Sequence, residues 1–461
     1  MLSTALEKRI KRQVIGKPHR FLAIAPLGFE QTLVQELLGF GLEFADTESS
    51  PHIVGDGKVE FTAKITESWK AVAYSRIANR ILMHIADFKA ENFRDLEKKA
   101  AEIPWELYLS DERTGYALQT RDERSISSNS LRIHVTCKHS RLYHSDAVAE
   151  RLEKTIGGSL PLAPAMSSAT PSAGVPRNAP QNLYVTLVDD RCTIWLDLAG
   201  EELYKRGHER FVNDAPLKET IAAAMIFESS HGLPSTSYCL LDLMAGSGTF
   251  SLEAAYTANG LIPGKCRDFA LKHQPAFKPA TWNHIVKQER VILSETPNGV
   301  ESKNLIARIL TSDISPKAVE IIKHNVECSP LAGIEPAPVS PELHDFFDYT
   351  AQEIAELCGE SSPVIVLNPP YGKRLDFDAP KLYTRIGRRL AELARALRAL
   401  GKPLTVAILA PKDDNRPGSA YTCTANLLRE CPGLSPDHNP AAKCIATSHG
   451  GFSLNVFIAK I

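Results

Sequence analysis

The chain has 461 residues, of which 43% are hydrophobic and 23% are charged, and its formal net charge at pH 7 is −1. This length predicts two to four domains of ~150 residues each, and the composition is ordinary for a globular protein. The balanced charge excludes bulk electrostatic capture of nucleic acid, so any such binding must use a local patch. No apolar run approaches the ~18 residues that a membrane span needs, and no membrane partner is expected.

The nine cysteines are scattered and form no C-x-x-C pair. This gives no signal for a zinc ribbon or a thioredoxin-type dithiol, and no metal site is predicted. Scattered single cysteines are typical of a reducing compartment, so we expect a cytoplasmic location.

The first 200 residues mix helical and strand periodicity. Strands are predicted at 21–25, 58–63, 131–137, 183–188 and 192–198, and helices at 29–38, 69–83 and 146–156. The last two strands flank Asp189-Asp190, an acidic turn that indicates a hairpin. We interpret residues 20–200 as an α+β region with an antiparallel or mixed sheet. Within it, residues 157–182 are rich in Pro, Ala and Ser and lack periodicity, which predicts a flexible insertion.

The second half changes to regular alternation of strands and helices. An amphipathic helix at 217–227 comes first. Strands then follow at 238–243, 309–312, 364–367, 404–410 and 452–460, with helices at 248–258, 316–327 and 382–400. This pattern predicts an α/β fold with a doubly wound sheet, in which ligands bind at the carboxyl ends of the strands.

The most informative segment is Asn368-Pro369-Pro370-Tyr371, which directly follows the apolar strand predicted at 364–367. The prolines stop the strand and keep Asn368 extended at its end. The Asn368 amide and the Pro369 carbonyl are then two rigid acceptors beside the Tyr371 ring. This arrangement suits an exocyclic amino group on a flat base. A plain Pro-rich turn after a core strand is the alternative.

A glycine loop follows the strand predicted at 238–243. Gly246 and Gly248 allow a close backbone approach to a ligand, but the third glycine of a dinucleotide site and the Gly-Lys-Ser/Thr of a P-loop are both missing. Asp242 at the strand end would repel a pyrophosphate and favour a cationic ligand such as S-adenosylmethionine. A plain tight turn is the alternative. The candidate cofactor contacts here are Asp242, Ala245, Gly246, Ser247, Gly248 and Thr249.

Two further acidic strand ends complete the predicted cofactor site. Asp313, followed by Ile314, could accept the ribose hydroxyls, although it lies 65 residues after Gly248 because of an insertion at 259–308. A helix N-cap is the alternative role for Asp313. Asp345 could accept an adenine amino group with Phe346 against the ring, or it could be a solvated turn.

Several stretches together carry a family resemblance. They are Phe21–Leu42, Val135–His144, Ala147–Arg151, Leu196–Gly207, Ala215–Ala224, Asp242–Gly248, Asp313, Ile262-Pro-Gly, Asn368–Tyr371 and His449-Gly-Gly. This set resembles the THUMP-containing RNA guanine-N2 methyltransferases, meaning the bacterial 23S rRNA type and its tRNA relatives, over about residues 20–461.

The resemblance implies a seven-stranded Rossmann-like methyltransferase domain at 201–461. The first twenty residues are basic, and together with the ferredoxin-like segment that the resemblance implies they make up residues 1–65. The resemblance also implies a THUMP-like RNA-binding domain at 66–200. Since the chain ends soon after the methyltransferase region, no second fused methyltransferase domain is expected.

The resemblance further implies methyl transfer from S-adenosylmethionine to the N2 of a guanosine in structured RNA, with 23S rRNA as the favoured substrate. Transfer to tRNA, a DNA adenine-N6 methyltransferase and a non-catalytic RNA-binding protein are the alternatives. The Asn368 side chain and the Pro369 carbonyl would hold the amine, and Tyr371 would stack on a flipped base. Lys138, Arg141, Lys373 and Arg374 are candidate RNA contacts, with solvated surface charges as their alternative.

Overall fold

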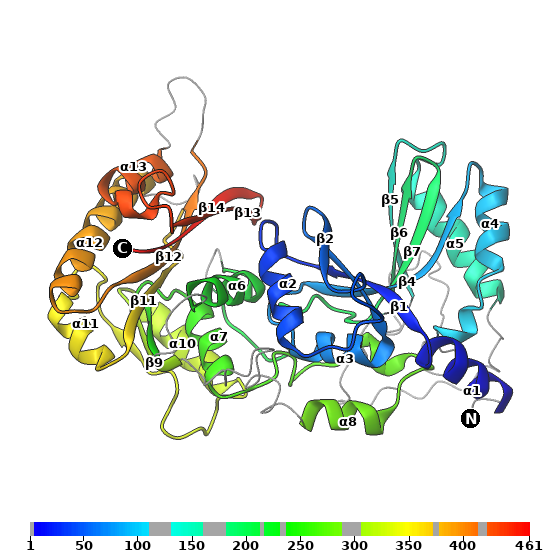
Figure 1. Cartoon of the computed structure of the whole chain (residues 1–461), viewed down its shortest axis with the longest axis horizontal. Helices are drawn as coiled ribbons and strands as arrows, with labels where there is room; N and C mark the ends of the chain where they lie inside the picture. Colours follow the sequence, from blue (N-terminus) through cyan, green and yellow to red (C-terminus); the bar gives the residue numbers. More distant parts are fainter. Residues whose placement is uncertain are drawn as a thin grey trace. The chain divides into compact units, whose positions relative to one another are not determined.

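The computed structural model describes residues 4–109, 131–159, 181–212, 216–230, 237–287, 306–371, 378–413 and 422–461 (Figure 1). The chain divides into two compact units. Unit 1 comprises Met1–Ile24, Phe40–Lys205 and Arg267–Gln288, and unit 2 comprises Ala25–Gly39, Arg206–Cys266 and Glu289–Ile461. The units interleave along the chain, whereas the domains expected from the sequence are contiguous. Those domain boundaries stay a prediction.

Unit 1 is built on a seven-stranded sheet with the order β2-β3-β1-β4-β7-β6-β5. Its strands are β1 (Pro18–Ile24), β2 (His52–Gly55), β3 (Lys58–Lys64), β4 (Arg80–Lys89), β5 (Arg132–Lys138), β6 (Asn182–Val188) and β7 (Arg191–Asp197). Strands β5 and β6 are parallel, and the other neighbours are antiparallel.

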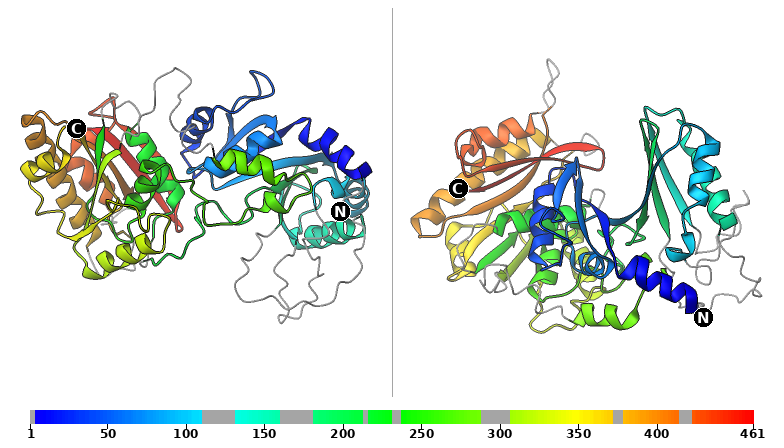
Figure 2. Two further views of the ribbon diagram at one scale, coloured as in Figure 1. Left: turned by 90° about the horizontal axis from the view of Figure 1, so that it is seen from below. Right: turned by 45° about the vertical axis from the view of Figure 1, so that its right-hand side comes forward.

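The helices of unit 1 are α1 (Thr4–Ile10), α3 (Ile65–Tyr74), α4 (Phe93–Ala101), α5 (Ser145–Ser159) and α8 (Pro279–Lys287), with short turns at Lys11–Ile15, Trp105–Leu107 and Ala270–His273. Figure 2 shows α4 and α5 against one face of the β4–β7–β6–β5 part of the sheet. There Leu96, Leu152 and Ile194 share a buried cluster. Burial of such side chains removes apolar surface from water and is the main force that holds the layers together.

The prediction of one helix in this unit was partly wrong. The pattern at 69–83 predicted a single helix, but α3 ends at Tyr74 and residues 80–89 form β4. The apolar residues between Ile77 and Met83, interrupted by Asn79 and Arg80, fit either period when they are read alone. The segment from residue 80 onward is a strand because it pairs with β1 on one side and with β7 on the other.

The predicted hairpin is confirmed. Strands β6 and β7 pair in antiparallel register around Asp189 and Asp190, whose φ angles are 50° and 62°. Aspartate tolerates this left-handed conformation better than most residues, and two aspartates in succession match the twist of a tight hairpin. Of the predicted insertion at 157–182, residues 160–180 lie outside the described residues.

Unit 2 contains the predicted doubly wound sheet, with seven strands in the order β10-β9-β8-β11-β12-β14-β13. The strands are β8 (Tyr238–Asp242), β9 (Ile306–Asp313), β10 (Pro341–Leu343), β11 (Ser362–Leu367), β12 (Thr405–Pro411), β13 (Lys443–His449) and β14 (Phe452–Lys460). Neighbours from β10 to β12 are parallel, and β14 is antiparallel to both β12 and β13. The strand order reverses between β8 and β11, which is where such sheets bind ligands.

The helices of unit 2 are α2 (Glu30–Gly39), α6 (Glu219–Ser230), α7 (Thr249–Ala258), α10 (Pro316–Glu327), α11 (Ala351–Cys358), α12 (Ala379–Ala399) and α13 (Cys423–Glu430), with a short turn at Pro432–Leu434. Helices α11, α12 and α13 cover one face of the sheet, and α6, α7 and α10 cover the other (Figure 1). Tyr383 and Leu390 fill the first layer, and Leu252 and Ile322 fill the second. Among the described residues, no helix combines the length and apolar character of a membrane span.

Helix α2 belongs to unit 2 although the strand before it belongs to unit 1. The buried Glu228 of α6 accepts a hydrogen bond from the Thr32 hydroxyl of α2 at 2.7 Å and pairs with Lys443 of β13 at 2.6 Å. Just before α2, Gly28 has φ +84°, and a Cβ there would lie 2.2 Å from the Ala446 carbonyl oxygen. Glycine therefore allows this close approach.

Candidate functional site

The predicted site residues come from strands whose carboxyl ends lie along one edge of the unit 2 sheet. In the parallel register, Asp313 is opposite Leu343, and Asp242 is opposite both Thr311 and Val366. The tips of β10, β9, β8 and β11 therefore lie side by side. This edge carries the glycine loop after β8, Asp313 at the end of β9 and Asn368 just after β11.

The glycine loop is held by the neighbouring strand. The Gly246 N–H donates to Asp313 Oδ2 at 2.8 Å, and the Ala245 N–H donates to the Ser312 carbonyl at 3.1 Å. Gly246 and Gly248 have φ angles of +58° and +77°, a region that favours glycine. A Cβ built on Gly246 meets no atom within 4 Å. There is open space against the loop backbone, as a ligand approaching closely requires.

Asp242 is fully buried under this loop. Its Oδ2 accepts hydrogen bonds from the Ser251 N–H at 3.1 Å and the Ser251 hydroxyl at 2.7 Å, and Ser251 in turn accepts from Thr311. Its Oδ1 is buried with no hydrogen-bond partner in the described structure. Burial raises the pKa of Asp242 to about 7. A buried acceptor without a partner is rare and costly, so Oδ1 has an unmet need for a donor.

Residues 206–212, which precede α6 and are called the covering segment below, lie against the outside of the glycine loop. Asn325 of α10 is completely buried. Its amide nitrogen donates to the Ser247 carbonyl at 3.0 Å and the Phe211 carbonyl at 2.9 Å, while its oxygen accepts from the Phe211 N–H at 2.8 Å. One side chain thus connects α10, the glycine loop and the covering segment.

Arg210 of the same segment reaches the loop hydroxyls. Its guanidinium donates to Thr249 Oγ1 at 2.5 Å and to Ser247 Oγ at 3.3 Å, and it forms an ion pair with Glu219. Only 11% of the Arg210 side chain is exposed. A positive charge is therefore held where the glycine loop passes into α7.

Asn368 lies just past the end of β11, as predicted. Its side-chain Oδ1 is shielded from solvent and has no hydrogen-bond partner in the described structure. Pro369 is buried and Pro370 is exposed. The Tyr371 ring is 8% exposed and meets Phe452 edge-on, with 5.8 Å between ring centroids. The strand end thus presents an unpaired acceptor close in sequence to two aromatic side chains.

The remaining predicted cofactor residues differ in exposure. Ile314 directly follows Asp313 and is 67% exposed, which is unusual for isoleucine. Asp345 forms a local turn in which its Oδ1 accepts from the Phe347 N–H at 3.0 Å. Phe346 is 1% exposed and packs in the core. The alternative role of Asp313 as a helix N-cap is filled by Ser315, whose hydroxyl accepts from the Ala318 N–H.

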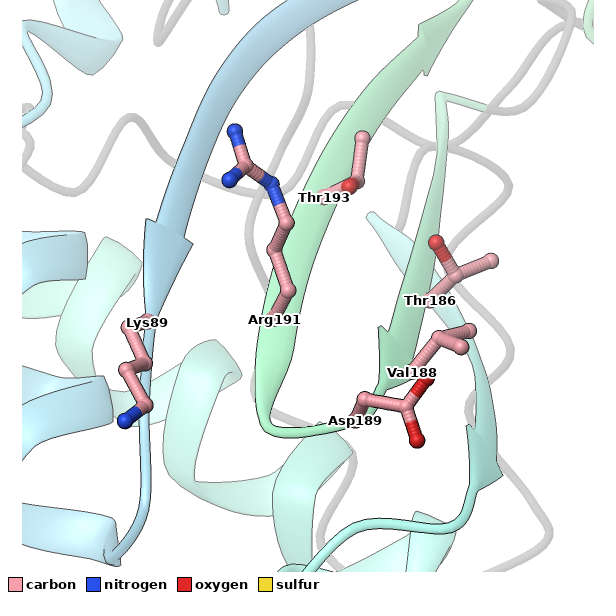
Figure 3. Close-up of a pocket in the computed structure, with 6 residues that line it drawn as sticks. All are labelled: Lys89, Thr186, Val188, Asp189, Arg191 and Thr193. Atoms are coloured by element: carbon pink, nitrogen blue, oxygen red, sulfur yellow. The ribbon is translucent and has the colours of Figure 1, made fainter.

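The predicted RNA contacts of unit 1 lie beside the β6–β7 hairpin. Lys138 is exposed at the end of β5, and Arg141 forms ion pairs with Glu91 and Asp190. Lys373 and Arg374 lie outside the described residues. A surface hollow of about 460 Å³ opens at this end of the sheet (Figure 3). The residues that line it are Lys89, Thr186, Val188, Asp189, Arg191 and Thr193.

The sequence interpretation missed Arg210 and Asn325. Asn325 carries a readable signal, because it is a polar residue on the buried face of the predicted helix at 316–327, and buried amides need partners. Arg210 lies in a segment without regular secondary structure, so the spacing of residues there does not predict which way its side chain points. Its partners become visible only when residues 206–212 fold against the loop.

Comparison with known proteins finds likeness to methyltransferases over parts of the chain. Residues 206–402 match the family model described as the RMKL-like methyltransferase domain, and residues 20–82 match the RlmL ferredoxin-like domain. A ribosomal RNA large subunit methyltransferase K/L of Allochromatium vinosum is 29% identical over 381 residues, which are 81% of this chain and 46% of that protein. The protein of the same name from Aliivibrio fischeri strain MJ11 is 29% identical over 377 residues, 81% of this chain and 47% of that protein. The chain thus spans about half the length of these relatives.

Solved structures show the same fold. A possible methylase from Clostridium difficile 630 has a TM-score of 0.67 at 21% identity, covering 96% of this chain and 98% of that chain. SMU.472, a putative methyltransferase complexed with SAH, has a TM-score of 0.66 at 21% identity with the same coverages.

Proposed function

We propose that the protein methylates the N2 of a guanosine in structured RNA, with 23S rRNA as the substrate. The proposal is supported by the match of residues 206–402 to the RMKL-like methyltransferase domain and of residues 20–82 to the RlmL ferredoxin-like domain. The methyl donor is S-adenosylmethionine, whose sulfonium carries the transferable methyl. The names of the relatives support an RNA of the large ribosomal subunit.

The site suits this donor better than a dinucleotide. Two carboxylates, Asp242 and Asp313, stand at the strand tips around the glycine loop, where they would repel a pyrophosphate and attract an ammonium or a sulfonium. Asp242 Oδ1 lacks a donor. We assign the exposed Ile314 as an apolar surface for the adenine ring and the Asp313 carboxylate as the acceptor of the ribose hydroxyls.

The unpaired Asn368 Oδ1 is the observation that carries the acceptor side of the proposal. An exocyclic amine has two N–H groups and a lone pair delocalised into its ring. If one N–H is held by Asn368 and the other by the Pro369 carbonyl, the nitrogen is favoured in a pyramidal form with its lone pair free to attack. Holding the two reactants in line supplies much of the acceleration. The nitrogen becomes cationic on transfer and then loses a proton readily, so no strong base is required.

RNA binding is proposed for unit 1, where Lys138 and the β6–β7 hairpin end are exposed. Because base edges in an A-form helix are hard to reach, such a surface would read RNA by shape and backbone. The guanosine itself would have to leave its stack to meet Asn368.

The decisive test is nucleoside mass spectrometry on 23S rRNA, tRNA and DNA from a strain lacking the gene, before and after treatment with the purified protein and S-adenosylmethionine. We expect N2-methylguanosine to be absent from the 23S rRNA fraction and restored by the protein. Restoration in tRNA alone would reassign the substrate, and N6-methyladenine in DNA would overturn the proposal.

The role of Asn368 is tested with Asn368→Ala, using Asn259→Ala at the far end of α7 as the matched control. Asn368→Ala is expected to lower transfer at least a thousandfold while calorimetry shows unchanged affinity for S-adenosylmethionine. The control should retain both properties. Normal transfer by Asn368→Ala would remove the paired-acceptor mechanism.

A further inference from the structure

A second cluster of chemically active side chains lies on the outer side of the cofactor loop. Glu209 of the covering segment, His324 of α10 and Cys328, the residue that directly follows α10, place one carboxylate oxygen, one imidazole nitrogen and one thiol sulfur within 4.8 Å of one another. Neither the family match nor the proposed methyl transfer assigns these residues a role. We propose that Glu209, His324 and Cys328 form a zinc site that fastens the covering segment to α10.

The distance between the thiol sulfur of Cys328 and the imidazole nitrogen of His324 fits a zinc ion. Cys328 Sγ and His324 Nε2 are 3.5 Å apart. Zn–S and Zn–N bonds of ~2.3 and ~2.0–2.1 Å at a tetrahedral angle require about 3.5 Å between these two atoms. Cys328 caps the end of α10 four residues after His324, and this spacing brings the two side chains together on the same side of the helix end. A thiol–imidazole hydrogen bond would give the same distance, so the distance by itself does not decide between them.

The donor set narrows the choice of metal. Thiolate and imidazole together favour zinc over the hard cations magnesium and calcium, which take oxygen ligands. Three protein ligands leave one tetrahedral position for water, which resembles an open rather than a closed zinc site. Binding takes the proton from the Cys328 thiol and releases it to solvent, while the metal keeps its oxidation state.

The surroundings hold the ligands in place. The ring of Phe211 stacks on His324 with 3.9 Å between centroids and 15° between planes, which fixes the imidazole orientation. The next residue, Asn325, is bonded to both Phe211 and the glycine loop. A metal at this point would therefore add a cross-link between the covering segment and the helix that supports the loop.

The test uses the full chain and zinc alone. Competition with a chromophoric chelator should show one equivalent of Zn²⁺, and Co²⁺ substitution should give the near-ultraviolet charge-transfer band of a thiolate ligand. Cys328→Ser and His324→Gln should each weaken zinc binding at least tenfold and remove the band. Cys444→Ser is the matched control, because Cys444 is also an exposed cysteine of unit 2, and it should change neither.

The proposal is overturned if the wild-type protein binds no stoichiometric zinc, or if the band survives Cys328→Ser. Loss of zinc binding in the control alone would also overturn it. Circular dichroism of each variant shows that lost binding does not come from unfolding. Since none of these readouts measures methyl transfer, they are independent of the proposed function.

Discussion

The Asp313 carboxylate, at the end of β9, accepts the backbone N–H of Gly246 at 2.8 Å through one oxygen and the N–H of Ser315 at 2.9 Å through the other. Asp313 therefore shapes the glycine loop before any ligand arrives. Its expected role as a ribose acceptor and its structural role in the loop use the same two oxygens.

Asp313→Ala should weaken binding of S-adenosylmethionine by more than tenfold, because it removes a proposed ligand contact and frees the loop. A tenfold loss corresponds to about 1.4 kcal/mol. Isothermal calorimetry measures it. Asp348→Ala, the same change at an exposed position, should leave affinity unaltered. Equal affinity of Asp313→Ala and wild type would remove this residue from the site.

Arg210→Ala should lower affinity for S-adenosylmethionine about tenfold, since charge-assisted hydrogen bonds to the hydroxyls of Ser247 and Thr249 are lost. Arg210→Lys keeps the charge but cannot reproduce the fork of donors, so we expect an intermediate affinity. Calorimetry on both variants gives the ranking. Identical affinities for Ala, Lys and wild type would show that Arg210 does not order the loop.

Asp242 predicts a specific pH dependence. Burial raises its pKa in the folded state to about 7, whereas an unfolded aspartate has a pKa of about 3.9. The folded state therefore binds the proton more tightly. The stability that this gives is fully present below pH ~4 and is lost as the pH rises through about 7.

Asp242→Asn removes this titration and keeps an oxygen to accept from Ser251. Relative to wild type, the variant should gain stability between pH 5 and pH 8, as measured by urea unfolding at the two values. The difference between the variants cancels the titration of other groups. The interpretation fails if the stability difference is the same at both pH values.

Gly28→Ala should destabilise unit 2 by several kcal/mol. The added methyl would meet the Ala446 carbonyl oxygen at 2.2 Å, and φ is +84°, so overpacking and backbone strain add. Gly260→Ala is the control, because its φ is +61° but no atom lies within 4 Å of the added Cβ; it should cost only about 1–2 kcal/mol. Thermal unfolding with a unit 2 probe compares them, and equal losses would show that the contact with Ala446 is not limiting.

Much of the sheet architecture was predictable because strongly apolar runs mark buried parallel strands. The run at 364–367 became β11, and it placed Asn368 at the strand end as expected. The turn at Asp189 and Asp190 was equally readable, since its chemistry is local. Such elements can be predicted because residues close in the sequence determine their conformation.

Other elements were missed, for different reasons. Strand β13 has mostly exposed side chains and is fixed by pairing with β14. Helix α11 was missed although Thr350 and Glu353 form a complete capping box at its start, a signal that the sequence does contain. In the site, the contacts of Arg210 and the cluster of Glu209, His324 and Cys328 form only when the irregular covering segment packs against the glycine loop and α10. Sequence periodicity does not predict that packing.

The interleaved course of the chain has a consequence for fragments of this protein. A piece that starts at residue 206 would carry the whole strand-and-helix alternation of unit 2 but would lack Ala25–Gly39, leaving Glu228 without Thr32 and uncovering the surface of α6 that α2 contacts. Likewise, unit 1 cannot be completed during synthesis until residues 267–288 have left the ribosome. Each unit therefore includes a segment that is far from the rest of it in the sequence. A fragment cut near residue 200 should lack part of its unit, expose apolar surface and tend to aggregate.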